Sequence, residues 1–188
     1  MDKITWEQLG PLKLLAGTWE GDKGKDTAPS DDRGTERNKF RERIVFAPIP
    51  PVKNHEQELF GLRYSTTAWE GDSPDPFHEE VGYWLWDPKE KQVLRSFIVP
   101  RGVTVLAGGK SHSDAKSFIL KAERGSKTYG ICSNQFLDRE FQTVSYKLKV
   151  TIHDGQSFSY EEDSVLKIKG QKKLFHHRDQ NTLAKISE

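Results

Sequence analysis

The amino-acid sequence predicts an all-β protein whose strands close into a single antiparallel barrel of about ten strands. From Gly17 onward, apolar and polar residues alternate with a period of two, which is typical of strands with one buried face. Turn-forming Gly, Pro, Asp and Asn residues separate these segments. Ten Phe, five Tyr and five Trp supply apolar area for a core, although only 34% of the residues are hydrophobic. A long twisted sheet tends to close on itself because closure removes its exposed edges.

A short helix is predicted near the N-terminus. Leu9, Leu12 and Leu15 recur at helical intervals, and the Gly10-Pro11 dipeptide limits the segment to one or two turns. Elsewhere the chain shows almost no helical periodicity, which favours the all-β interpretation.

The strand candidates follow one another along the rest of the chain. Residues 144–152 form the clearest candidate, because apolar side chains at even positions from Val144 to Ile152 occupy one face. The same alternation runs from Phe158 to Ile168, and residues 183–186 predict a short closing strand. The other candidates are residues 39–46, 58–69, 79–86, 92–99, 103–107 and 117–122.

Two segments are expected to be loops. Residues 22–37 are charged and rich in Gly, Asp and Lys, which is typical of a mobile surface loop. Residues 47–57 contain three prolines and predict a second loop. Gly108-Gly109 is interpreted as a hairpin-like turn. Because there is no internal repeat and no recognisable linker, residues 1–188 are expected to form one domain.

The charge balance disfavours nucleic-acid and membrane partners. With 29 basic and 28 acidic residues the formal net charge is +1, so no global field steers the chain toward a polyanion. No apolar run approaches the ~20 residues of a membrane helix, and we expect a cytoplasmic protein. The single cysteine, Cys132, excludes an internal disulfide and a Cys-based zinc cluster, and it is interpreted as a buried or half-buried thiol. Nothing in the sequence indicates an oligomeric state.

Histidines are the main candidates for chemistry. The chain has no phosphate-binding loop, nucleophile elbow, paired-His helix motif or dinucleotide fingerprint. His55, His112 and His153 lie in turn-like contexts and are expected to be exposed.

The remaining histidines lie on predicted strands. His176 and His177 face opposite sides of any strand, and periodicity does not decide which of them enters the barrel. Glu162 continues the face of Phe158, so it either makes a polar contact in the lumen or lies at a solvated strand end. His78 opens the strand at residues 79–86 and shares its face with Glu80, Gly82, Trp84 and Trp86.

Three motifs resemble those of one known family, the nitrobindins. The segment from Gly17 through Trp19 and Gly21 to Gly24 resembles the family's opening Gly-x-Trp-x-Gly-x-Gly signature, with one extra residue before the last glycine. Residues 77–84 resemble the central His-x-x-x-Gly-Tyr strand, and residues 177–183 resemble the His-containing ending of the longer bacterial members. Order and spacing agree from about residue 10 to the end of the chain.

The resemblance implies a lipocalin-like or fatty-acid-binding-protein-like barrel that holds ferric heme b at one mouth through a single histidine. It implies His177 as the iron ligand, with an offset of one residue leading to His176, and His78 as the catalytic residue on the opposite side of the pocket. Members of the family react with nitric oxide and isomerise peroxynitrite to nitrate, an activity that is an expectation for this chain. The cofactor-binding residues carried over from the opening signature are Gly17, Thr18, Trp19, Gly21 and Gly24.

Two other functions stay open. The protein could be a non-catalytic carrier whose aromatic lumen holds a small lipophile such as a fatty acid, with Arg95 or Arg101 fixing the carboxylate. Alternatively, aromatic side chains could fill the lumen completely, and the barrel would then act through its surface.

Overall fold

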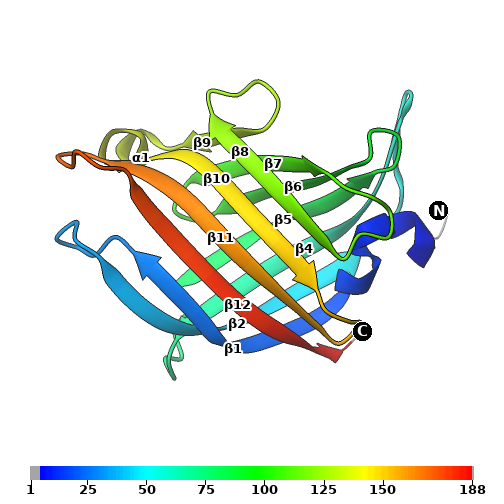
Figure 1. The fold of residues 1–188 in the computed structure, drawn as a ribbon, viewed down its shortest axis with the longest axis horizontal. Helices are drawn as coiled ribbons and strands as arrows, with labels where there is room; N and C mark the ends of the chain where they lie inside the picture. The colour runs from blue at the N-terminus through cyan, green and yellow to red at the C-terminus, as the bar shows by residue number, and fades with distance from the viewer. Residues whose placement is uncertain (1–4, 188) are drawn as a thin grey trace.

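The computed structural model describes residues 5–187, whose strands form one sheet that closes into a barrel (Figure 1). Pairing between the two ends of the sheet, β2 with β4, closes the ring, and β3 pairs only with β4. In sheet order the strands are β2 (Glu36–Pro48), β1 (Gly17–Ala28), β12 (Phe175–Ser187), β11 (Ser157–Ile168), β10 (Phe141–Ile152), β8 (Ser117–Arg124), β9 (Gly130–Ser133), β7 (Val103–Lys110), β6 (Gln92–Val99), β5 (His78–Asp87), β4 (Gln57–Glu70) and β3 (Val52–Asn54).

The predicted closed barrel is confirmed, with one irregular position. β7 and β8 pair directly at Gly108 and Lys121, and the short strand β9 is inserted between them further along. β9 runs parallel to β8, whereas the other pairs within residues 5–187 are antiparallel. Counting β9, eleven of the described strands form the ring, which agrees with the expected number of about ten.

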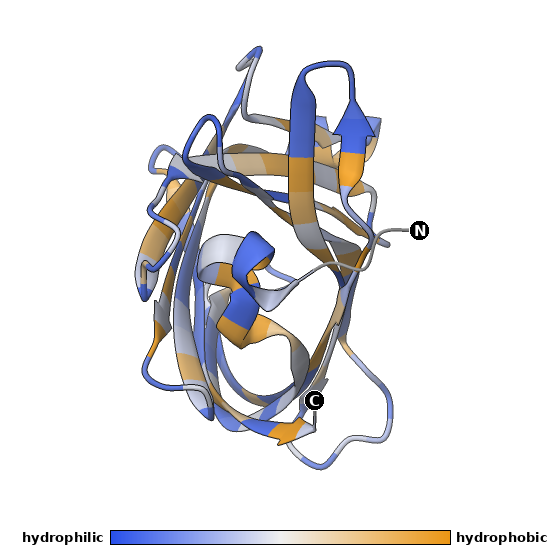
Figure 2. Ribbon diagram, turned by 90° about the vertical axis from the view of Figure 1, so that its right-hand side faces the viewer, coloured by the Kyte–Doolittle hydropathy of each residue, from blue (hydrophilic) through white to orange (hydrophobic). Residues whose placement is uncertain are grey.

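The N-terminal helix closes one end of the barrel. It is a 3-10 helix, η1 (Trp6–Leu15), that lies across the opening when the molecule is viewed from this end (Figure 2). Leu9, Leu12 and Leu15 are completely buried, although the backbone is not helical at Gly10, where the segment kinks between Leu9 and Leu12. Trp19 Nε1 donates a hydrogen bond of 2.7 Å to the carbonyl oxygen of Leu15. The predicted short helix is therefore confirmed, and it acts as a plug.

Aromatic side chains fill the interior next to this plug. Trp19 packs edge-on against Phe158 with ring centroids 4.9 Å apart, and Phe46 packs edge-on against Trp84 at 5.9 Å. All four rings are buried. Edge-to-face pairs of this kind add stability beyond the burial of apolar area.

The prediction of a loop at residues 22–37 is wrong. β1 continues to Ala28 and β2 begins at Glu36, so only the turn between them is irregular. Most charged residues on the two strands of this hairpin are exposed, among them Lys23, Lys25 and Arg37, while Gly24 and Asp26 are buried on its inner face. High charge content therefore indicated a solvated strand face here.

The predicted turn at Gly108-Gly109 is also wrong, since both residues lie within β7. A Cβ at Gly108 would meet the Tyr129 ring at 2.3 Å, and one at Gly109 would meet the Ile119 carbonyl oxygen at 1.9 Å. Glycine is needed at these two positions because neighbouring groups approach the backbone closely.

Several other expectations are corrected by the structure. Residues 47–57 contain the short strand β3, and the closing strand begins at Phe175 rather than at residue 183. A six-residue helix, α1 (Gln135–Glu140), was not predicted; Asn134 caps it by accepting a hydrogen bond of 3.0 Å from Leu137 N. Cys132 is exposed on β9, because it lies at an outward position of the alternation.

Other expectations hold. His55, His112 and His153 are exposed, as predicted from their turn-like contexts. No helix within residues 5–187 is long and apolar enough to cross a membrane.

The plug supplies a stability prediction. Gly10 has a φ of +55°, and a Cβ there would lie 2.6 Å from the Trp86 ring, so Gly10→Ala combines backbone strain with a clash. We expect a loss of about 2–4 kcal/mol in the free energy of unfolding, measured by urea denaturation. Gly71→Ala is the matched control: its φ is +49° but no atom lies within 4 Å, and about 1 kcal/mol should be lost. Equal losses in the two variants would contradict the role of Trp86.

Candidate functional site

His177 lies on the inner face of β12, and its neighbour His176 lies on the outer face. Burial alternates along the strand, with Asn181 and Leu183 fully inside and His177 in phase with them. The His177 side chain is 36% exposed, whereas His176 points outward and contacts Asp163 at 2.9 Å. The alternative that the sequence left open is thus decided by the register of β12.

The end of the barrel near His177 is the one that η1 does not close. The β1–β2 and β11–β12 turns lie at this end, opposite the N-terminal helix (Figure 1). His177 is the third residue of β12 and pairs with Ser164 of β11. An imidazole on the inner face near this mouth is partly accessible from outside.

A carboxylate holds the His177 ring. His177 Nε2 lies 3.0 Å from Asp26 Oδ1, and Asp26 is buried on the inner face of β1. Asp26 also pairs with Asp179 across the β1–β12 ladder. The sequence interpretation missed Asp26 because it placed this residue in a loop.

His78 begins β5 and points toward the interior. As predicted, its face of the strand also carries Glu80, Trp84 and Trp86, which are all buried. His78 Nε2 lies 3.8 Å from Glu80 Oε2. Burial lowers the pKa of His78, but the contact with Glu80 and its charge outweigh this effect and raise the pKa above the ordinary value.

Arg95 is the centre of a buried polar network. Its guanidinium donates to Glu162 Oε2 at 3.0 Å and to Tyr64 Oη at 3.1 Å, and it also bonds to Glu80 and Tyr146. Tyr146 donates to Glu162 at 2.6 Å, so Glu162 is confirmed as a polar contact in the lumen. Burial by itself would raise the pKa of Glu80. The charge of the adjacent Arg95 outweighs this effect and lowers the pKa to about 2.

Two interior carboxyl groups lack such a cation. Glu42 accepts hydrogen bonds from Tyr160 Oη at 2.9 Å and from Asn181 Nδ2 at 2.8 Å, but burial raises its pKa to about 7. Burial and the charges of Glu162 and Glu42 raise the pKa of Asp179 well above its ordinary value. The inner wall therefore carries neutral carboxyl groups at mildly acidic pH.

The structure separates the residues of the opening signature from His177. Trp19 is packed at the plugged end together with Gly17 and Thr18, and it pairs with Lys185. Lys185 is eight residues along β12 from His177, a separation of roughly 26 Å along the strand. These three residues support the plug and do not contact His177.

The later glycines of the signature lie nearer the mouth. A Cβ at Gly21 would meet Asn181 Nδ2 at 2.9 Å, and one at Gly24 would meet the Phe40 ring at 2.6 Å. Both glycines let inner-face side chains pack against the β1 backbone. They shape the wall beside Asp26.

The mouth offers one donor of the kind that a heme cofactor needs. A heme would be held here by a protein side chain that binds its iron, and a neutral imidazole is a common choice. The partly exposed His177 ring offers an imidazole near the mouth, and its Nε2 contacts Asp26. Among residues 5–187, no three His, Cys, Asp or Glu side chains gather into a group that could hold a metal ion.

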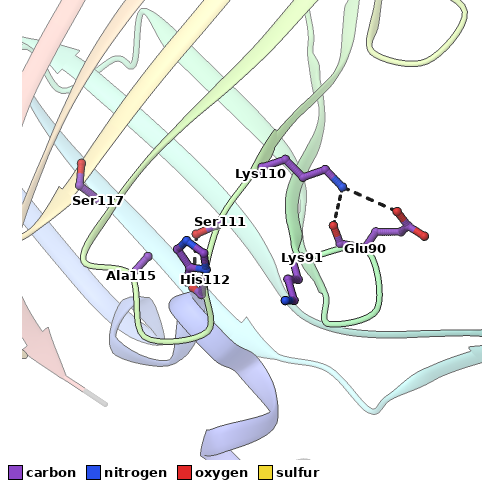
Figure 3. A pocket seen from close by; sticks show the side chains of 7 residues that line it. All are labelled: Glu90, Lys91, Lys110, Ser111, His112, Ala115 and Ser117. Atoms are coloured by element: carbon purple, nitrogen blue, oxygen red, sulfur yellow. Dashed lines mark hydrogen bonds and ion pairs between the residues drawn. The ribbon is translucent and has the colours of Figure 1, made fainter.

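A separate hollow lies on the outside, near η1. A pocket of about 400 Å³ is lined by seven residues (Figure 3). Lys110 Nζ is held there by the Glu90 carbonyl oxygen at 2.6 Å and by the Glu90 carboxylate at 3.7 Å. Neither His78 nor His177 lines this pocket. The lining residues are Glu90, Lys91, Lys110, Ser111, His112, Ala115 and Ser117.

The interior carboxyl groups predict a pH-dependent stability. The pKa of Glu42 is raised in the folded state, so its contribution to stability is fully present below about pH 4.5 and is lost as the pH rises through about 7. Glu42→Gln keeps the acceptor oxygen and removes the charge. Chemical denaturation should therefore show the variant more stable by about 2–3 kcal/mol at pH 8 and nearly unchanged at pH 4.5. Glu161→Gln, on the exposed face of β11, is the control.

Removing Arg95 should be costly. Arg95→Met leaves Glu80 and Glu162 without their cation, and we expect a loss of about 3–5 kcal/mol at pH 7 in guanidinium denaturation. Arg63→Met, at an exposed position of β4, should change the stability by less than about 0.5 kcal/mol. A small effect of Arg95→Met would show that the two carboxylates do not depend on this guanidinium.

Comparison with known proteins agrees with this fold. The peroxynitrite isomerase of Clavibacter michiganensis subsp. michiganensis is 40% identical over 79 residues, which is 41% of this chain and 35% of that protein. The peroxynitrite isomerase of Leifsonia xyli subsp. xyli is 42% identical over 78 residues, 41% of this chain and 34% of that protein. The matched segments thus span about a third of the length of these relatives.

A solved structure and a family model extend the comparison to the whole barrel. The crystal structure of Rv2717c from M. tuberculosis superposes with a TM-score of 0.67, covering 95% of this chain and 97% of that one at 21% identity, which shows the shared fold. The model of the THAP4-like, heme-binding β-barrel domain matches residues 8–185. The resemblance to the nitrobindins is thereby confirmed, and this chain belongs to the family of THAP4-like heme-binding β-barrel domains.

Proposed function

We propose that this protein binds heme b at the open mouth of the barrel through His177 and isomerises peroxynitrite to nitrate there. The observation that carries the proposal is the partly exposed His177 imidazole on the inner face, at the end that η1 leaves open. Membership of a heme-binding family and the names of the two relatives support it. The protein would also react with nitric oxide, a second small ligand of heme iron.

Beside a bound heme, His78 would act on the anionic substrate. When bound, the heme supplies an open iron position at which a small oxidant can react. His78 would hold a proton on the inner wall, since the contact with Glu80 favours the protonated ring. A positive imidazole attracts an anion such as peroxynitrite and can donate a hydrogen bond to it.

The interior disfavours the alternative of a fatty-acid carrier. The Arg95 guanidinium, which could have fixed a lipid carboxylate, already bonds to Glu80 and Glu162. A fatty acid would have to displace these two carboxylates. Aromatic rings also fill the space next to the plug. These contacts favour a ligand at the mouth over a lipid deep in the lumen.

Hemin titration of the purified protein tests the proposal. The wild-type protein should bind one hemin with a shift of the Soret absorbance, and His177→Ala should lose that spectrum. His176→Ala is the matched control, because His176 is adjacent, faces outward and contacts Asp163. Identical hemin spectra and affinities for His177→Ala and the wild type would rule out His177 as the ligand. Peroxynitrite decay with nitrate as the product should then follow heme occupancy across the variants.

A further inference from the structure

A groove lies at the plugged end of the barrel, between η1, the β5–β6 turn (residues 88–91) and the loop of residues 111–116. It consists of the hollow of about 400 Å³ described above and a second hollow of about 520 Å³, and Lys91 and His112 line both of them. Each hollow has the volume of a site for a small organic molecule. The groove is at the end opposite His177, so it is independent of the proposed heme site.

The second hollow has an apolar floor. Phe60, Trp86 and Pro88 line it, and Phe60 and Trp86 are only 5% and 4% exposed. A Cβ at Gly10 would lie 2.6 Å from the Trp86 ring, so η1 packs closely against this ring. The floor therefore offers a fixed apolar surface to a flat apolar group.

Where the two hollows meet, Lys91 supplies a positive charge and His112 a ring N–H. Figure 3 shows Lys91 on the β5–β6 turn, opposite the loop that carries Ser111 and His112. Within residues 5–187, neither the Lys91 ammonium group nor the His112 ring has a hydrogen-bond or ion-pair partner. Ser111 is only 7% exposed, and the one hydrogen bond that its hydroxyl donates within the described chain is long, at 3.4 Å to the carbonyl oxygen of His112. A buried hydroxyl that is bonded so weakly is available to a ligand.

The acidic side chains that line the groove do not occupy these donors. Glu7 and Glu90 each form an ion pair with a different lysine, at 2.9 and 3.7 Å. Asp114 is the remaining acid of the lining, and it is exposed in the loop of residues 111–116. Because Asp114 forms no ion pair with Lys91, the ammonium group stays free for an external anion, which Asp114 partly repels.

Hydrogen bonds hold both rims of the groove. Asp87 Oδ1 accepts a hydrogen bond of 3.0 Å from Glu90 N, which shapes the β5–β6 turn. Ser111 N donates to the Lys91 carbonyl oxygen at 2.9 Å and joins the loop to this turn. Lys91 itself has a φ of +50°, a left-handed conformation that is unfavourable for lysine. The groove is thus preformed, which lowers the entropic cost of binding.

We propose that the groove binds an organic anion with a flat apolar body and one carboxylate or phosphate group. The apolar body packs on Phe60 and Trp86. The anionic group lies between Lys91 and His112 and accepts a hydrogen bond from each. Hydrogen bonds to an ionised group are stronger than neutral ones. The barrel thereby takes a small organic acid at its plugged end, independently of the mouth.

NMR titration of the ¹⁵N-labelled full chain with 1-naphthoate and with 1-naphthyl phosphate tests the proposal. The indole N–H signal of Trp86, assigned with Trp86→Phe, should shift and saturate. The neutral analogue 1-naphthylmethanol should bind roughly 10-fold more weakly, because it lacks the charge. The tighter of the two anions identifies a carboxylate or a phosphate site.

Three variants test the role of charge. Lys91→Gln should weaken naphthoate binding roughly 3–10-fold. Asp114→Asn should tighten it roughly 2–3-fold, since a nearby negative charge is removed. Lys147→Gln, at an exposed position of β10, is the control and should leave the affinity unchanged.

Other results would overturn the proposal. A neutral analogue that binds as tightly as naphthoate would show that no anion is recognised, and so would unchanged affinity in both Lys91→Gln and Asp114→Asn. No shift of the Trp86 signal at millimolar ligand, or shifts confined to residues around His177, would mean that the groove is not the site. Circular dichroism checks the folding of each variant, and the neutral analogue decides the question in the wild type if a variant does not fold.

Discussion

The polar interior of the barrel depends on the ion pairs that the guanidinium of Arg95 forms with Glu80 and Glu162. Closing a sheet into a barrel turns every second side chain toward a space with little water, and several of these side chains are acidic. Arg95 bonds directly to Glu80 on the neighbouring wall and to Glu162 on the opposite wall, and its charge lowers the pKa of Glu80. Glu42 lies beyond its reach, and burial raises the pKa of that group to about 7. The position of this one cation therefore separates the lowered pKa of Glu80 from the raised pKa of Glu42.

The two ends of the barrel differ in composition: one is packed with apolar side chains, and the other has a polar inner wall. At one end, η1 and the rings around Trp19 exclude water and stabilise the fold by apolar burial. At the other end the inner wall is polar, with His177, His78 and carboxyl groups. A small reactive ligand needs an accessible site, and the partly exposed His177 ring lies at this polar end.

Strand β1 links the two ends. Its first residues, Gly17 to Trp19, belong to the plug, and after a β-bulge between Gly21 and Gly24, Asp26 belongs to the mouth. A single additional residue reverses which face points inward, so a small difference in the glycine motif changes the chemistry of the inner wall.

The sequence by itself determined the all-β class, the N-terminal helix, the inward face of β5 with His78 and Glu80, and the family, because alternation and motif spacing are local properties of the chain. Tertiary structure alone decided that His177 rather than His176 faces inward, since adjacent residues differ only in register with β11 and β1. It also decided the Asp26 contact and the pairing of Arg95 with Glu80 and Glu162. These contacts join residues up to 151 positions apart, and closure of the barrel brings them together.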